Sequence, residues 1–265
     1  MLRVYLIQTD SSKGSKAENL ARAKGLILDA NPSEGNLILL PEMFATGYIP
    51  VSLDAAAEDF NSRDSGETAN MLSEVASATN CTVMGAGIKK AGNKFLNHVS
   101  VYTPSTPKES FAYDKMNLFF PEKETFKAGE KINLFNIKDW KIASFICYDL
   151  RFPELFREAT KQGANLITVQ AAWPAKRRAH WETLLKARAI ENQVYIAAVN
   201  AVSTHPDTRH PFAGTSLIIS PNGDVIAQGS AQSEEVITAE LDLQAEKDYR
   251  KSFPVLDGIV PPELM

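Results

Sequence analysis

Cysteine is scarce in this sequence of 265 residues, which contains only Cys81 and Cys147. Two thiols cannot build a disulfide framework, and a chain of this length needs none, because it buries roughly 70–75% of its extended surface on folding. The N-terminus lacks the basic and long apolar segments of a signal peptide, and no apolar run approaches the roughly 20 residues that span a bilayer. We therefore expect a cytoplasmic protein with no membrane partner.

The sequence also contains few histidines and has no excess of positive charge. None of the four histidines is spaced with a cysteine as a zinc site requires. The 28 Lys and Arg residues are outnumbered by 32 Asp and Glu residues, so the chain lacks the basic footprint of a nucleic-acid-binding protein. The dinucleotide-binding, Walker and Gly-x-Ser-x-Gly patterns are missing as well. We expect no metal, no organic cofactor and no nucleic-acid partner.

Apolar residues make up 44% of the chain, and they form short runs that alternate with longer amphipathic stretches. Some runs, such as residues 37–40, are continuously apolar, as strands covered on both faces should be. The pattern predicts strands at residues 3–8, 36–40, 82–88, 99–102, 141–147, 166–170, 195–200, 216–220 and 236–241, and helices at residues 17–30, 68–79, 153–162 and 179–193. No linker or convincing internal repeat divides the chain, which indicates one α/β domain over residues 1–265.

Three reactive side chains lie at the end of an apolar, strand-like run or just after one. Glu42 comes after residues 37–40 and a proline, Lys115 comes after an apolar stretch that ends at Tyr113, and Cys147 precedes a predicted helix. Ligands of open α/β sheets bind beyond the carboxyl ends of the strands. These three side chains can therefore converge in one cleft.

Each of these residues also has an ordinary structural explanation. A lone cysteine near an apolar strand is commonly a buried small hydrophobe, and this is our interpretation of Cys81. Cys147 differs because it lies at a strand-to-helix turn, where the helix dipole is expected to lower the pKa of a thiol. Glu42 is expected to be poorly hydrated, which suits acid–base chemistry, but it could instead cap a helix or pair with an arginine. Lys115 could be a solvated lysine.

Together, the three segments resemble the glutamate, lysine and cysteine motifs of the nitrilase superfamily of carbon–nitrogen hydrolases. The matching segments are Pro41-Glu42, Tyr113-Asp114-Lys115, the run from Cys147 to Leu155, His180-Trp181-Glu182, Gly214-Thr215-Ser216 and Tyr249-Arg250-Lys251. They occur in the order of the family and cover nearly the whole chain. The resemblance implies a four-layer α-β-β-α sandwich that assembles through its helices into a homodimer or a larger homo-oligomer, with no metal or cofactor.

The resemblance also implies roles for individual residues. Cys147 would be the nucleophile, Glu42 the general base and Lys115 the oxyanion stabiliser. The family pattern of a second, positioning glutamate matches Glu122, and Glu124 is the competing assignment.

Further roles concern the substrate. The backbone N–H of Tyr148 is expected to bind the oxyanion, and Trp173 to help position the substrate. A cation should hold a substrate carboxylate. The candidates are Arg151, Lys176, Arg177 and Arg178, although the run of three basic residues could also be a solvated loop.

The expected reaction is hydrolysis of a small carboxylate-bearing amide by water, through a cysteine thioester, with release of ammonia. True nitrilases typically have Cys-Trp-Glu, whereas Cys147-Tyr148-Asp149 with the Arg-Phe that follows is similar to omega-amidases, which act on 2-oxoglutaramate-like monoamides. A deaminated-glutathione amidase and a hydrolase of N-carbamoyl amino acids or amines are alternatives, and an inactive scaffold relative is the non-enzymatic one. Two departures from the family bear on the pocket wall: Asn117 replaces a histidine, and Ala172 replaces an asparagine before Trp173.

Overall fold

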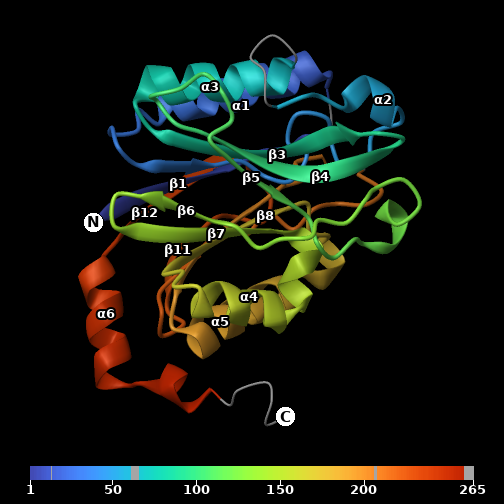
Figure 1. The fold of residues 1–265 in the computed structure, drawn as a ribbon. Coiled ribbons are helices and arrows are strands. Elements are labelled where there is room, and N and C mark those ends of the chain that lie inside the picture. The colour runs from blue at the N-terminus through green and yellow to red at the C-terminus, as the bar shows by residue number, and fades with distance from the viewer. Residues whose placement is uncertain (13, 61–65, 206–207, 260–265) are drawn as a thin grey trace.

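The computed structural model describes residues 1–12, 14–60, 66–205 and 208–259, and the strands in these residues form two sheets of six. In spatial order, the first sheet contains β12 (Glu235–Leu241), β1 (Leu2–Gln8), β2 (Leu37–Leu39), β3 (Thr82–Ala91), β4 (Lys94–Tyr102) and β5 (Phe111–Asp114). The second contains β11 (Val225–Gln228), β10 (Leu217–Ile219), β9 (Tyr195–Asn200), β8 (Leu166–Ala171), β7 (Trp140–Ile146) and β6 (Leu134–Ile137). The two sheets lie face to face (Figure 1).

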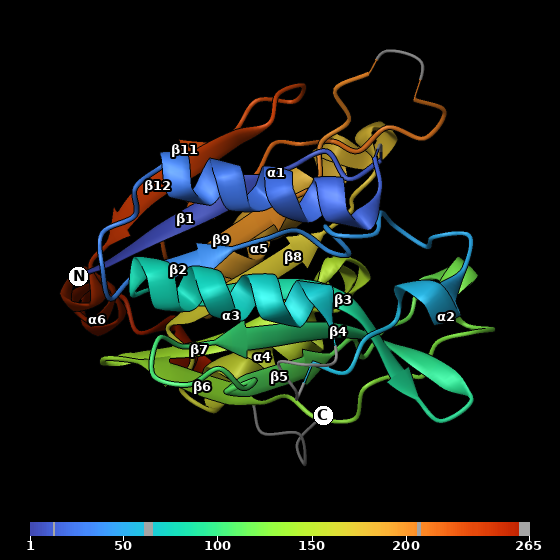
Figure 2. The ribbon, with the colours of Figure 1, turned by 90° about the horizontal axis from the view of Figure 1, so that it is seen from above.

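Helices cover the outer face of each sheet. The first sheet carries α1 (Lys16–Asp29) and α3 (Glu67–Thr79), and the second carries α4 (Pro153–Lys161) and α5 (Arg178–Asn192) (Figures 1 and 2). The predicted four-layer α-β-β-α sandwich is therefore confirmed. The remaining helices are α2 (Leu53–Ala56), α6 (Leu243–Ser252) and the 3₁₀ helices η1 (Phe120–Glu122), η2 (Cys147–Arg151), η3 (Ala175–Arg177) and η4 (Val255–Gly258). Within the described ranges, no helix is both long enough and apolar enough to cross a membrane.

The alternation of side chains along β1 shows how one strand serves two layers. Leu2, Val4 and Leu6 belong to the core that includes residues of β7 in the opposite sheet. Tyr5 and Ile7 belong to the core that includes residues of α1 and α3. Both faces of the strand are buried over residues 4–7, which explains why this part of its sequence is continuously apolar.

All predicted strands and helices are present, although their ends move by a few residues. Cys147 lies outside β7 and begins η2, because the chain turns sharply at this residue instead of continuing the strand. The predicted strand at residues 99–102 is the second half of β4, whose first half contains polar residues that interrupt the apolar run. The apolar pattern predicts neither α6 nor β6, since the first is strongly polar and the second has only four residues.

The two sheets repeat one connectivity. In the first, β1, β2 and β3 are parallel neighbours, and antiparallel strands lie on both sides of them. In the second, β7, β8 and β9 form the same parallel core with antiparallel neighbours. The last strand, β12, crosses to the first sheet and pairs with β1. The repeat is one of architecture, and the sequence does not show it.

Candidate active site

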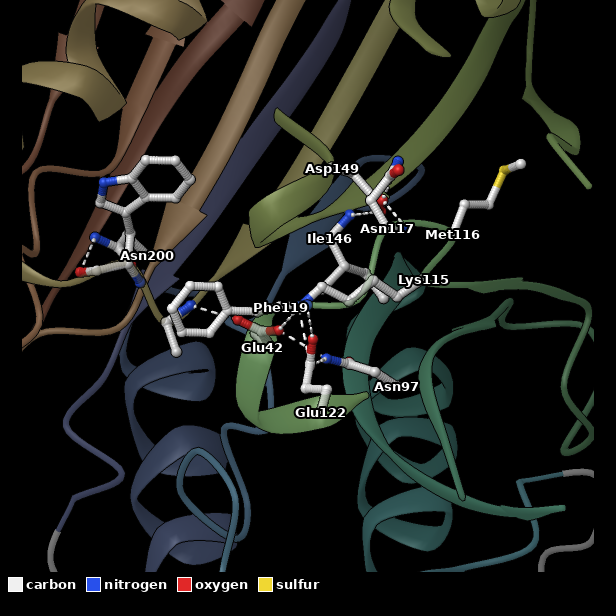
Figure 3. Close-up of polar contacts among 12 residues, drawn as sticks. Glu42, Asn97, Lys115, Met116, Asn117, Phe119, Glu122, Ile146, Asp149 and Asn200 are labelled. Atoms are coloured by element: carbon white, nitrogen blue, oxygen red, sulfur yellow. Dashed lines mark hydrogen bonds and ion pairs between the residues drawn. The ribbon is translucent and has the colours of Figure 1, made fainter. Parts of the chain in front are cut away.

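Glu42, Lys115 and Cys147 meet at one end of the sandwich, as predicted. They follow β2, β5 and β7, and all three side chains are buried. Lys115 Nζ donates a hydrogen bond of 2.9 Å to Glu42 Oε1 (Figure 3), and the charges of Glu42 and Lys115 both act on the thiol of Cys147. The ends of strands from both sheets therefore contribute to one site.

Glu122 joins this group, whereas Glu124 does not. Glu122 Oε1 accepts a hydrogen bond of 2.9 Å from Lys115 Nζ, and its Oε2 accepts one of 2.7 Å from the backbone N–H of Phe119. The side chain of Glu122 is fully buried, while Glu124 is exposed. The geometry thus favours Glu122 as the second glutamate.

Backbone contacts hold Lys115 on both sides. Its N–H donates to the carbonyl oxygen of Asn97 at 2.9 Å, and its carbonyl oxygen accepts from the N–H of Gly129 at 2.8 Å. A Cβ atom on Gly129 would lie 2.1 Å from the carbonyl oxygen of Asp114, so this close approach requires glycine. These contacts fix the backbone from which the Lys115 side chain extends, and the carboxylates of Glu42 and Glu122 hold its ammonium group.

The carboxylates determine the charge of the lysine. Burial alone would lower the pKa of Lys115, but Glu42 and the neighbouring anionic groups hold it well above its usual value. Burial raises the pKa of Glu122, with the Lys115 charge opposing and the Glu42 charge reinforcing this effect. Lys115 therefore stays a cation between two acidic groups.

Cys147 lies in a strained turn. Its φ of 45° falls in the left-handed region, which is uncommon for a residue with a Cβ atom. Burial and then the Glu42 carboxylate raise the pKa of the thiol well above its usual value, and Lys115 opposes them. The predicted lowering of the thiol pKa is therefore wrong, because removal from water beside a carboxylate outweighs the dipole of a short turn.

Asp149 connects the turn of Cys147 to the segment after Lys115 (Figure 3). Its Oδ1 accepts hydrogen bonds from the N–H and the side-chain amide of Asn117 at 2.8 and 3.1 Å. Its Oδ2 accepts from the N–H of Ile146 at 3.0 Å and from the hydroxyl of Tyr113 at 2.8 Å. Burial raises the pKa of Asp149 to about 6. Asn117 thus points to Asp149 and does not line the cavity described below, contrary to the expectation that it bears on the pocket wall.

The exit of β8 supplies a backbone group that no motif predicted. The N–H of Ala172 donates to Glu42 Oε2 at 2.9 Å. The next residue, Trp173, is buried and lines the cavity, and its N–H donates to Asn200 Oδ1 at 2.7 Å. Every residue except proline offers a backbone N–H, so the sequence carries no signal for the role of Ala172.

A cavity of about 910 Å³ opens beside Cys147. Its wall is largely aromatic and includes Tyr48, Phe119, Phe120, Tyr148, Trp173 and Phe212. Of the four predicted cations, Arg151, Lys176 and Arg177 line the cavity, and Arg178 does not. Arg209 also lines it, and no sequence pattern predicts this, because the residue lies in a segment without helical or strand periodicity.

Arg151 and Arg177 create positive charge at one side of this cavity. The Arg151 guanidinium lies 4.7 Å from the ring centre of Trp173 and 5.7 Å from that of Tyr148. Burial, followed by the charge of Arg177, lowers the pKa of Arg151. No Asp or Glu is among the described residues that line the cavity, so these cations face it without a carboxylate from its wall. The arrangement suits the binding of an anion.

Comparisons with known proteins show the family of this chain. Residues 3–251 match the family model described as Carbon-nitrogen hydrolase. A Bacillus subtilis (strain 168) protein named 2-oxoglutaramate amidase is 34% identical over 258 residues, which cover 97% of this chain and 96% of that protein. An Escherichia coli (strain K12) protein named Omega-amidase YafV is 34% identical over 221 residues, which cover 83% of this chain and 82% of that protein. The crystal structure of Saccharomyces cerevisiae Nit3, described as a member of branch 10 of the nitrilase superfamily, has a TM-score of 0.85 and 28% identity over 96% of this chain and 94% of that one. The resemblance seen in the sequence is thereby confirmed, and the chain belongs to the carbon–nitrogen hydrolase family.

Proposed function

We propose that this protein hydrolyses the C–N bond of a small carboxylate-bearing amide of the 2-oxoglutaramate type, consuming one water and releasing ammonia. One observation carries the proposal: a buried lysine contacts two buried carboxylates beside a buried cysteine, which opens on a cavity lined by cations. The names of the two amidase relatives support the same substrate class.

The first half of the reaction forms a thioester. Because burial keeps the thiol of Cys147 protonated at rest, Glu42 takes its proton as sulfur bonds to the amide carbon. The electron pair of the C=O bond moves to oxygen, where Lys115 and the backbone N–H of Tyr148 stabilise the negative charge. When the C=O bond re-forms, the C–N bond breaks, and Glu42 returns the proton to the departing nitrogen. Ammonia leaves, and the acyl group remains on sulfur.

The second half of the reaction regenerates the enzyme. Glu42 takes a proton from water as the water oxygen bonds to the thioester carbon. The tetrahedral intermediate then expels the sulfur of Cys147, which regains its proton from Glu42, and the product is a carboxylic acid. Glu122 exchanges no proton in this scheme, since its contacts with Lys115 and with the N–H of Phe119 assign it to positioning.

The cations of the cavity wall fit the second functional group of the substrate. We assign the substrate carboxylate to Arg151 and Arg177, because the charge of one acts on the other across the same side of the cavity. Lys176 is the alternative partner for Arg151. Trp173 lies beneath the Arg151 guanidinium and forms the wall that orients the substrate.

A substrate panel tests the proposal. We expect ammonia release with the highest kcat/KM on 2-oxoglutaramate, compared with deaminated glutathione, N-carbamoyl amino acids and nitriles. A preference for one of the other substrates would replace the proposed substrate class and leave the triad in place. No turnover of any amide, together with slow and unselective iodoacetamide labelling of Cys147, would favour the inactive scaffold.

We also propose a cytoplasmic homodimer of single-domain chains. Phe253, just after α6, and Val255, at the start of η4, are 57% and 43% exposed, and Ile190 on α5 is 50% exposed. Apolar side chains exposed on neighbouring outer helices are typical of an interface between subunits. Both cysteines are free thiols, which suits a reducing compartment. Sedimentation equilibrium should give at least twice the chain mass of 29.1 kDa, and a species of 29.1 kDa would contradict the assembly.

A further inference from the structure

Asn97, on β4, contacts all three charged members of the buried cluster (Figure 3). Its Nδ2 donates hydrogen bonds of 2.7 Å to Glu42 Oε1 and 2.8 Å to Glu122 Oε1. The backbone carbonyl oxygen of Asn97 accepts a hydrogen bond of 2.9 Å from the backbone N–H of Lys115. Lys115 Nζ donates to the same two carboxylate oxygens, at 2.9 Å each. Each Oε1 atom therefore accepts one hydrogen bond from the ammonium group and one from the amide.

The pairing of β4 and β5 places Asn97 on this side of the sheet. His98 lies opposite Asp114 in the strand register, and His98 Nδ1 is 2.7 Å from Asp114 Oδ1. Successive side chains of a strand point to opposite faces. The residue before His98 and the residue after Asp114 therefore share the other face, where Asn97 meets Lys115.

The hydrogen bonds use the two oxygens of Glu42 unequally. A carboxylate has about two acceptor sites on each oxygen. On Oε1, Lys115 and Asn97 fill both sites, whereas Oε2 accepts from the N–H of Ala172 at 2.9 Å. One acceptor site remains, and it lies on Oε2. Oε2 of Glu42 is consequently the oxygen that can accept the proton of an attacking nucleophile.

The amide of Asn97 has one acceptable orientation. Reversed, its Oδ1 would lie against two carboxylate oxygens, which repel it. In the observed orientation, Oδ1 is buried and has no hydrogen-bond partner. An unpartnered buried acceptor costs free energy that an isosteric leucine would not. The donor end of the side chain therefore requires an explanation beyond the packing of β4.

Asn97 is a neutral donor. Glu122 and Glu42 are two acidic groups beside the one ammonium of Lys115, and Asn97 donates to both without adding a second positive charge. The hydrogen bond from Asn97 lowers the pKa of Glu122, against burial and Glu42, which raise it. The other titratable groups that act on this cluster are Cys147, Tyr48 and Asp149.

We propose that Asn97 is a positioning residue that fills Oε1 of Glu42 and Oε1 of Glu122, and so leaves Oε2 of Glu42 as the atom that takes and returns the proton. This inference rests on the proposed function, in which Glu42 moves that proton. It assigns to Asn97 a part in proton transfer that neither the sequence motifs nor the comparisons indicate.

The test compares Asn97→Leu with Asn192→Leu. Asn192, on α5, is a matched control because it is also buried, donates from Nδ2 to a backbone oxygen and has an unpartnered Oδ1. We expect Asn97→Leu to lower kcat about 10- to 100-fold, since hydrogen bonds to charged groups are lost, while KM changes less than about threefold. The acid limb of the kcat/KM profile should move to higher pH, because Glu122 loses a hydrogen bond that lowers its pKa and then loses its charge beside Lys115 at higher pH. Asn192→Leu should keep the wild-type kcat and pH profile.

A kcat within about twofold of wild type in Asn97→Leu, or an unmoved acid limb, would overturn the proposal. If Asn97→Leu does not fold, Asn97→Asp keeps the shape. It should be strongly impaired at neutral pH and recover in part in mild acid, where the new carboxyl group regains an O–H donor. No recovery would contradict the proposed role of the donor.

A titration without substrate separates this proposal from the proposed function. The carboxyl ¹³C shift of Glu122, assigned with Glu122→Gln, should titrate at higher pH in Asn97→Leu than in wild type. An unmoved titration in a protein that hydrolyses amides would overturn the role of Asn97 alone. If the Glu122 titration moves but the wild-type protein hydrolyses no amide, the proposed function is overturned. The proposed transfer of a proton through Glu42 is then overturned as well.

Discussion

The two halves of the sandwich share one connectivity, yet they place different chemistry at equivalent strand ends. β2 and β8 hold the same position in their sheets. The exit of β2 supplies the Glu42 carboxylate, and the exit of β8 supplies the backbone N–H of Ala172 that binds it. β1 and β7 are equivalent as well. After β1, the carboxylate of Asp10 accepts hydrogen bonds from the N–H groups of Ser12 and Thr204. After β7, Cys147 lines the cavity. The position of a strand places the residue after it at this end of the molecule. The side chain of that residue then determines whether it takes part in the reaction.

The comparison also explains why neither half can form the site alone. The first half contributes both carboxylates and the lysine, and the second contributes the cysteine and the cations of the cavity wall. Substitutions at equivalent positions of the two halves should therefore have unequal effects.

The largest difference is expected between the two cysteines. Cys147→Ala removes the nucleophile and should abolish amide hydrolysis, whereas Cys81→Ala removes a buried thiol just before β3 and should keep most of the activity. Mass spectrometry of the enzyme quenched during turnover should find the acyl group on the Cys147 peptide. Substantial turnover by Cys147→Ala would contradict the mechanism.

The second difference concerns carboxylates at strand exits. Glu42→Gln keeps the shape and removes the base, so the single-turnover rate of acylation should fall by about 10²- to 10⁴-fold. Asp10→Asn is the matched control after β1, and its acylation rate should stay within a few-fold of wild type. If both variants lose the same part of the acylation rate, the substitutions act by destabilising the protein. A lower melting temperature in thermal unfolding would show this.

A smaller loss is expected for Lys115. Lys115→Met should lower kcat by about 10²- to 10³-fold, as the loss of one oxyanion donor does. The ammonium opposes the burial and the Glu42 charge that raise the pKa of Cys147, so its removal should raise that pKa further. The rate of iodoacetamide labelling at Cys147 should then rise at higher pH than in wild type. Superimposable labelling profiles in a folded variant would separate Lys115 from the nucleophile.

Arg151 should affect binding more than chemistry. Arg151→Met should raise KM for an amide that carries a carboxylate by about 10-fold or more, because a charge-assisted hydrogen bond is lost. The KM for a neutral amide of similar size should change little. Arg178→Met is the control, since Arg178 does not line the cavity. An equal rise in KM for both substrates would assign Arg151 to the shape of the pocket.

The smallest effect is expected from a chelator. Within the described residues, no group of three or more His, Cys, Asp or Glu side chains could hold a metal ion. Dialysis against EDTA should leave kcat and KM unchanged. A loss of activity that zinc restores would contradict a reaction carried by protein side chains.

Parts of this site were predictable from the sequence, and the physical reasons are clear. Glu42 and Lys115 follow apolar strands, so local periodicity places them at the edge of a sheet. The role of Ala172 depends on a backbone N–H, and that of Asn97 depends on the register of β4 against β5, neither of which leaves a signature in local composition. The pKa of Cys147 was predicted in the wrong direction because burial by distant segments is not visible at the turn itself. The fold class followed from family motifs, whereas α6 has a polar sequence whose placement depends on tertiary contacts.

The pairing of β12 with β1 has a consequence for synthesis of the protein. The strand that completes the first sheet is translated more than 220 residues after the strand it joins. Until then, β1 has an unpaired edge that can bind other extended chains, and such long-range pairing is slow to form. The nascent chain therefore exposes an aggregation-prone edge until residues 235–241 have been made, and only then can the first sheet be completed.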